Sequence, residues 1–176
     1  RHHVTSPALD FAEAELAFRQ GRYGTAAALA SNAARAAHES KYGRSLRARI
    51  LLRAGQSALL DSHERDALDH FRAARAIAPR GPLERESLVG EFFASVDLGL
   101  EGADVLLAEL DELSSHGIED LVRMSIARTL YAERSGGLFD ALAEARAVYP
   151  LVDRIVDPII KTSFLNTYGQ SLALTG

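Results

Sequence analysis

The side chains best suited to bind a metal ion lie in one short segment. His63, Asp66 and His70 are spaced so that all three would share one face of a helix. A zinc-binding helix of the His-Glu-x-x-His type would need a second histidine at the position of Ala67. An acidic residue in the first turn of a helix is also favoured by the helix dipole, which explains Asp66 without a metal. We therefore predict no metal site and no cofactor.

Two glycine-rich segments have the composition of phosphate-binding loops, Gly99–Gly102 and Ser135–Gly137. Neither follows a strand or precedes a Lys-Ser/Thr pair, both of which such a loop requires. Turns between helices explain these glycines. The chain has no cysteine, and none of its serines lies in a nucleophile-elbow motif. We predict no catalytic residue and a protein that is not an enzyme.

Arginine dominates the basic side chains, since 18 of the 20 basic residues are Arg. Guanidinium groups bind carboxylate and phosphate in a bidentate geometry, so clustered arginines could form a site for an anion or an acidic peptide. Two alternatives remain: GC-rich coding, and ordinary helix faces on which Arg lies three or four residues from Glu or Asp. The two clusters are Arg44, Arg47, Arg49 and Arg53, followed by Arg72, Arg75, Arg80 and Arg85.

The overall composition excludes several classes of protein. The 176 residues have a net charge of −4, which argues against a direct contact with nucleic acid. No run of 18 apolar residues exists, so we expect no membrane span and a cytoplasmic location. The absence of cysteine excludes a disulfide framework. Because the chain begins with Arg1 and its one Met is Met124, we expect it to be part of a longer protein.

The positioning elements are expected to be helices, because apolar residues recur with helical periodicity and 30 residues are Ala. In the first helix we expect a stripe of Leu9, Ala12, Leu16 and Phe18. Glycine, as in Gln20-Gly21, or proline marks many of the helix ends. No segment predicts a strand. The nine expected helices cover approximately 7–19, 23–37, 44–60, 63–78, 83–98, 103–113, 118–134, 138–148 and 157–174.

Most connections are short, which predicts antiparallel helical hairpins. The first joint, Phe18 to Ala26, resembles the turn of a tetratricopeptide repeat. The second hairpin follows that consensus at Leu51, Ala54, Gly55, Ala58, Ala67, Phe71, Ala74 and Pro79. In later hairpins, Phe139, Leu142 and Ala145 are expected to pack against Ile126, Ala127 and Leu130. The small-residue positions assigned to the repeats are Ala14, Gly55, Phe93, Ala127 and Gly169, so the period is near 40 rather than 34.

The resemblance is to divergent tetratricopeptide arrays of bacterial signalling regulators, such as the maltose-regulon activator and the large ATP-binding LuxR-type transcription factors. It implies an all-α fold: a right-handed superhelix of about four and a half antiparallel hairpins, in one domain over 1–176. It further implies a sensor segment between a nucleotide-binding module and a DNA-binding helix-turn-helix. The expected hairpins are 7–40, 43–79, 82–115 and 118–149, followed by an unpaired helix at 157–175.

In such an array the first helix of each hairpin lines the concave face. Projecting the consensus onto this sequence predicts a partner-binding surface that mixes aromatic, aliphatic and arginine side chains, which suits a peptide or an amphipathic helix. The predicted residues are Phe11, Glu15, Phe18, Arg19, Arg49, Leu52, Gln56, Leu59, Leu60, Tyr131 and Arg134.

The functional prediction is a non-enzymatic module that binds a protein, a peptide or a small effector, as part of a transcriptional regulator. One alternative is self-association, because the last helix would leave Leu165, Tyr168 and Leu172 partly uncovered. Another is an enzyme built on stacked helices, for which no motif speaks.

Overall fold

A computed structural model describes residues 6–38, 43–115 and 117–176, and within these residues every regular element is helical. The predicted all-α class and the nine α-helices are confirmed for this part of the chain. The helices are α1 (Pro7–Arg19), α2 (Tyr23–His38), α3 (Arg44–Leu60), α4 (Glu64–Ile77), α5 (Pro82–Asp97), α6 (Ala103–Glu112), α7 (Ile118–Ser135), α8 (Leu138–Val148) and α9 (Pro158–Thr175). Residues 39–40 of the first expected hairpin lie outside the described part.

The helix ends follow local sequence signals. Gly21, with φ of 71°, follows the end of α1 in the left-handed conformation that glycine adopts at least cost. The side chain of Asp157 accepts a hydrogen bond of 2.8 Å from the backbone N–H of Ile159 and so caps α9, which begins at Pro158. One element was not predicted: a 3₁₀ helix, η1 (Tyr149–Arg154), lies between α8 and α9.

The chain divides into two compact units, Arg1–Leu98 with α1 to α5 and Gly99–Gly176 with α6 to α9. The boundary falls inside the hairpin expected at 82–115. The arrangement as a continuous superhelix stays a prediction. None of the described helices is long and apolar enough to cross a membrane.

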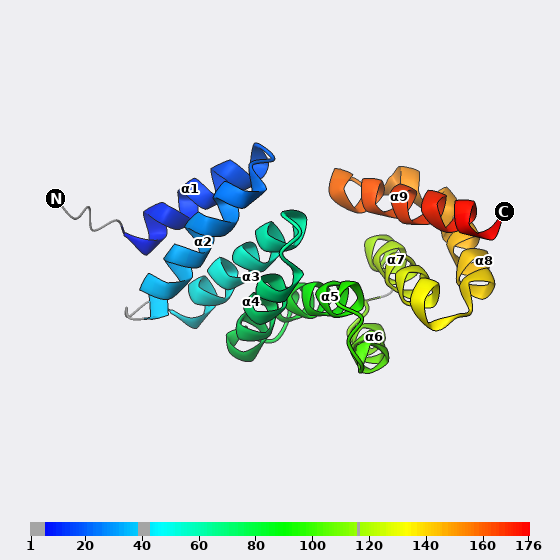
Figure 1. Cartoon of the computed structure of the whole chain (residues 1–176), viewed down its shortest axis with the longest axis horizontal. Helices are drawn as coiled ribbons and strands as arrows, with labels where there is room; N and C mark the ends of the chain where they lie inside the picture. The colour runs from blue at the N-terminus through cyan, green and yellow to red at the C-terminus, as the bar shows by residue number, and fades with distance from the viewer. Residues whose placement is uncertain (1–5, 39–42, 116) are drawn as a thin grey trace. The chain divides into compact units, whose positions relative to one another are not determined.

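In the first unit each helix packs beside the next along the chain, from α1 to α5 (Figure 1). Ala14 of α1, Ala30 of α2 and Ala54 of α3 form a fully buried cluster. The stripe expected on α1 is wrong, because Leu9 and Leu16 are 52% and 55% exposed. Alanine lets helices approach closely, so the small residues of α1 form the contact and the larger leucines lie outside it.

The contacts of α3, α4 and α5 centre on Phe71, whose side chain is 1% exposed. A Cβ built on Gly55 of α3 would lie 2.8 Å from the Phe71 ring, and one built on Gly90 of α5 would overlap the same ring. The ring therefore lies between two glycines that are 35 positions apart. The small residue of the third repeat is Gly90 and not Phe93, which corrects the register predicted from the sequence.

In the second unit, α7 packs against α8 and α9. Phe164 of α9 is 1% exposed, and its ring stacks on Tyr168 with 5.7 Å between centroids. Leu142 and Ala145 of α8 are buried as predicted. Phe139, which was expected to pack beside them, is 74% exposed, so this part of the prediction is wrong. It is the second residue of α8, where the side chain extends beyond the buried face.

Candidate functional site

The predicted binding residues of the first unit fall on two packed helices, α1 and α3. We define the α1–α3 surface as Glu15 and Phe18 of α1 together with Arg49, Arg53 and Gln56 of α3. The spacing of four and three residues from Arg49 to Gln56 places these three on one face of α3. Structure thus brings together four residues that the sequence predicted and adds Arg53.

Arg53 is held in place by two residues of α1. Its Nε donates to Glu15 Oε1 at 2.5 Å and its Nη2 donates to Glu15 Oε2 at 3.2 Å, which is a bidentate ion pair. The guanidinium carbon lies 3.9 Å above the centroid of the Phe18 ring, a cation–π contact. Phe18 in turn meets Tyr23 edge-on, with 5.5 Å between centroids. This arrangement presents a guanidinium with a fixed orientation at a half-buried position.

Arg49, one turn earlier, is exposed and lacks the carboxylate that Arg53 has. Its guanidinium carbon lies 6.0 Å from the centroid of the Phe11 ring. Among the described residues, no carboxylate forms an ion pair with Arg49. Arg49 therefore offers free hydrogen-bond donors to an anion.

Phe11 belongs to the hydrophobic core rather than to the exposed surface. It is 8% exposed and packs with Ala33, Ala37 and Ile50. Phe11 can support Arg49 from below but offers little area of its own to a ligand.

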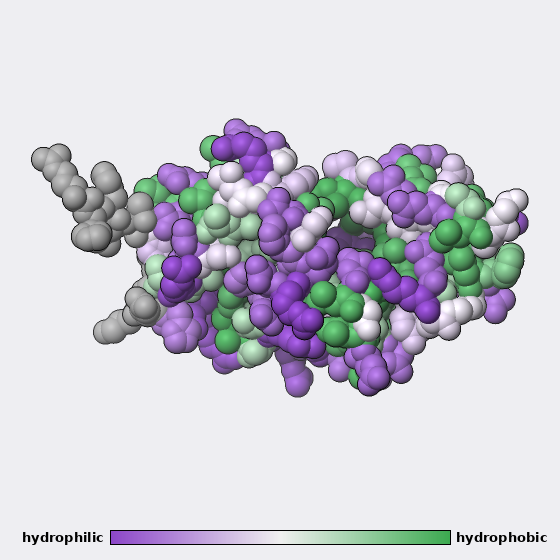
Figure 2. All heavy atoms as spheres, in the orientation of Figure 1, coloured by the Kyte–Doolittle hydropathy of each residue, from purple (hydrophilic) through white to green (hydrophobic). Residues whose placement is uncertain are grey.

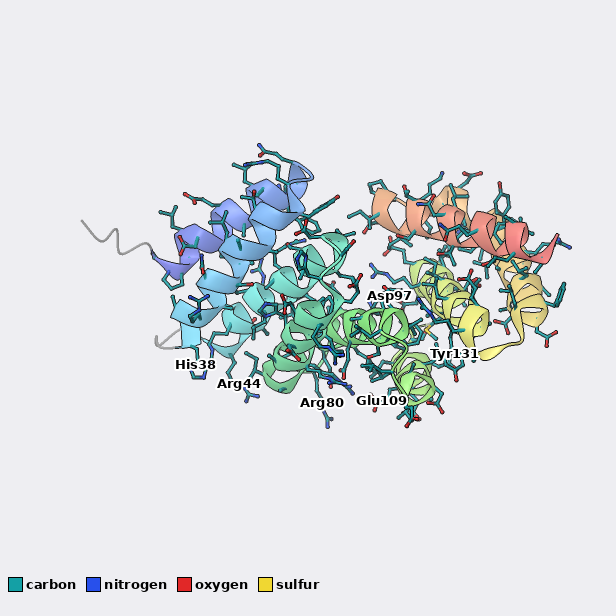
Figure 3. The ribbon with its side chains drawn as sticks, viewed as in Figure 1. His38, Arg44, Arg80, Asp97, Glu109 and Tyr131 are labelled. Carbon is teal, nitrogen blue, oxygen red and sulfur yellow. The ribbon has the colours of Figure 1, made fainter. Side chains whose placement is uncertain are left out.

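The charge of α3 is unusually one-sided. The helix contains Arg44, Arg47, Arg49 and Arg53 and no acidic residue. Like charges three or four residues apart destabilise a helix slightly, so the grouping costs stability that a bound anion would recover. In Figure 3 the side chain of Arg44 lies at the start of α3 and that of His38 at the end of α2, which extends the basic character to this corner.

The two units differ strongly in net charge. Residues 1–98 contain 14 basic and 12 acidic side chains, whereas residues 99–176 contain 6 basic and 12 acidic ones. The first unit has a net charge of +2 and the second of −6, with histidine neutral. An anionic ligand is therefore favoured by the first unit and disfavoured by the second.

The remaining predicted residues differ in exposure. Leu52 is buried at 6% exposure and cannot contact a ligand without a rearrangement. Leu59 is half-buried, Leu60 is 49% exposed, and Arg19 is exposed at the end of α1. Tyr131 and Arg134 lie on α7 of the second unit and so do not belong to the α1–α3 surface.

The second arginine cluster has a different arrangement. Arg72 Nε donates to Glu91 Oε1 at 3.2 Å, and Arg75 Nη1 donates to Glu91 Oε2 at 3.1 Å. Glu91 is 7% exposed, so both guanidinium groups compensate a buried carboxylate between α4 and α5. These two arginines stabilise the packing of the unit.

Comparisons with known protein families, with curated proteins and with solved structures found no match to this chain. Its function is therefore argued from its own residues.

The histidines considered as metal ligands contact protein oxygen atoms. His63 Nδ1 lies 2.8 Å from the backbone oxygen of Asp61, and His70 Nε2 lies 3.0 Å from Ser31 Oγ. Within residues 6–38, 43–115 and 117–176, no group of three or more His, Asp or Glu side chains could hold a metal ion. His70 instead forms a polar contact between α2 and α4.

This position of His70 predicts a loss of stability in mild acid. Burial lowers the pKa of His70 below its usual 6.5, although Asp66 and Asp69 act in the opposite direction. Between the two pKa values the unfolded chain binds the proton and the folded chain does not, so stability is complete above pH 6.5 and falls as the pH drops below it. Urea unfolding at a series of pH values should show that the wild type loses more stability than His70→Gln. A difference between the two proteins that does not change with pH contradicts this.

Proposed function

We propose that the first unit is a non-enzymatic binding module whose ligand is a peptide or protein segment with carboxylate side chains. The observation that carries the proposal is the pair of adjacent guanidinium groups on α3. Arg53 is oriented by Glu15 and Phe18, and Arg49 is exposed above Phe11. Two guanidinium groups four residues apart can each bind one carboxylate.

The neighbouring residues favour a peptide over a small anion. Gln56 extends the row with a side-chain amide, which can donate to or accept from a peptide backbone. Leu60, one further turn along α3, is 49% exposed and adds an apolar contact. A ligand that combines acidic and apolar side chains matches this sequence of groups.

The finer architecture that we propose is the right-handed superhelix of tetratricopeptide-like hairpins. It is supported by the sequential packing of α1 to α5 and by Phe71, which packs between Gly55 and Gly90. From the same resemblance we propose that the module is the interaction segment of a cytoplasmic transcriptional regulator, in which ligand binding changes the arrangement of flanking domains.

The binding proposal is tested with three labelled peptides of one length and one apolar pattern that carry Glu, Gln or Lys at alternate positions. Fluorescence anisotropy at low salt should show binding of the Glu peptide, with affinity at least about tenfold above that for the Gln peptide, because a hydrogen bond to a charged group contributes roughly 1.5–3 kcal/mol. Arg49→Ala should lower affinity for the Glu peptide about tenfold.

Arg65→Ala is the matched control, because Arg65 is an exposed arginine of α4 and its loss changes the net charge equally. It should leave the affinity within about twofold. Equal affinity for the Glu and Gln peptides, or equal losses in Arg49→Ala and Arg65→Ala, would contradict the proposal.

A further inference from the structure

The second unit has an exposed apolar stripe on the outer face of α9. Leu165 and Leu172 are 41% and 37% exposed, and Gly169 lies between them on the same helix face. A Cβ built on Gly169 would meet no atom within 4 Å. The opposite face of α9 is the one buried in the unit. Its buried residues are Ile160, Phe164, Thr167 and Ser171.

The stripe carries no charge, although it belongs to a strongly acidic unit. From Thr162 to Gly176 the sequence contains no Asp, Glu, Lys or Arg. A partner attracted by charge would find nothing to pair with on this helix. Two copies of an acidic unit, by contrast, repel each other wherever their charged faces meet, so an uncharged face is where they can come together. Figure 2 shows hydrophobic residues on the visible surface of the region of α8 and α9.

The spacing of the stripe is also self-complementary. Leu165 and Leu172 are placed symmetrically about the peptide bond that joins Tyr168 to Gly169. If two α9 helices cross antiparallel at that point, Leu165 of each copy faces Leu172 of the other. A two-fold interface requires this reciprocity. Gly169 lies at the centre, where the absence of a side chain allows the two backbones to approach closely.

We propose that this stripe is the interface of a homodimer, formed by α9 of one copy packed antiparallel on α9 of a second copy. The contact runs along an 18-residue helix, about 27 Å in length. Such a single-helix contact is small for a protein interface, so the dimer dissociates on dilution. This interaction is independent of the peptide-binding surface of the first unit.

The experiment is sedimentation equilibrium of the whole chain over a dilution series. The wild type should approach twice its 19.0 kDa at high concentration and the monomer mass at low concentration. Leu165→Glu should raise the dissociation constant at least about tenfold, because it buries an unpaired carboxylate against Leu172 of the other copy. Gln170→Glu adds the same charge to an exposed position of α9 outside the stripe and should change it less than about twofold.

Two double variants test the antiparallel geometry. Leu165→Glu with Leu172→Lys places opposite charges together twice in an antiparallel dimer and should restore association relative to Leu165→Glu. Leu165→Glu with Leu172→Glu places like charges together and should remain monomeric. Circular dichroism checks that each variant keeps its helix content.

Three results would overturn the proposal. The first is a wild type that stays monomeric up to about 1 mM, where even a weak dimer would form. The second is equal dissociation of Leu165→Glu and Gln170→Glu. The third is no difference between the two double variants.

Discussion

Phe71→Ala is expected to destabilise the first unit by about 3–5 kcal/mol, the largest effect of any substitution considered for this chain. The ring is 1% exposed and lies against Gly55 and Gly90, which have no side chains that could move into the space left behind. The cavity therefore stays open, and three helices lose their shared contact. Urea unfolding followed by circular dichroism measures the loss.

Phe139→Ala is the matched control, because the same atoms are removed from a residue that is 74% exposed. It should change the free energy of unfolding by less than about 1 kcal/mol. If both phenylalanine variants cost the same, Phe71 does not have the packing role that the structure assigns to it.

Gly90→Ala is expected to cost about 1–3 kcal/mol, although alanine is normally the better residue in a helix. The added methyl group would overlap the Phe71 ring, and that ring is confined on its other side by Gly55. Either the ring leaves its position or α4 and α5 move apart. Thermal unfolding should show a lower midpoint than for the wild type.

Gly169→Ala provides the comparison, since this glycine is also inside a helix but has open space around it. At concentrations where the chain is monomeric it should stabilise the protein by up to about 1 kcal/mol, because alanine has the higher helix propensity. Opposite signs for the two glycine variants are the expected result.

A second substitution can locate the cause of the Gly90 effect. Phe71→Leu in the Gly90→Ala background removes ring atoms from the place where the methyl group is added. The two changes should together cost less than the sum of the single variants, because they compensate in volume. Additive costs would place the damage of Gly90→Ala elsewhere.

How much the sequence predicts differs between secondary and tertiary structure. The nine helices and signals such as Gly21 and Asp157 were found because helix periodicity, proline, glycine and capping residues act through the local backbone. The candidate site was found in part, because the repeat consensus placed Glu15, Phe18 and Arg49 on facing helices. Arg53 was passed over in that list even though it lies four residues from Arg49, the spacing that puts two residues on one helix face.

The pairing of those residues depended on tertiary structure. A helix pattern does not say which of two apolar stripes is buried, and on α1 the core uses Phe11 and Ala14 while Leu9 and Leu16 remain exposed. The choice is made by the neighbouring helices, whose alanines admit only small partners or a ring in the right place.

The sequence by itself determined that this chain is helical, that its basic side chains are arginines and that they cluster. Only the tertiary structure distinguished the two clusters, because Arg72 and Arg75 share the buried carboxylate of Glu91 while Arg49 meets no carboxylate among the described residues. The physical reason is that a charge is compensated by groups close in space. Helix packing brings such groups together from positions 16 to 38 residues apart in these ion pairs.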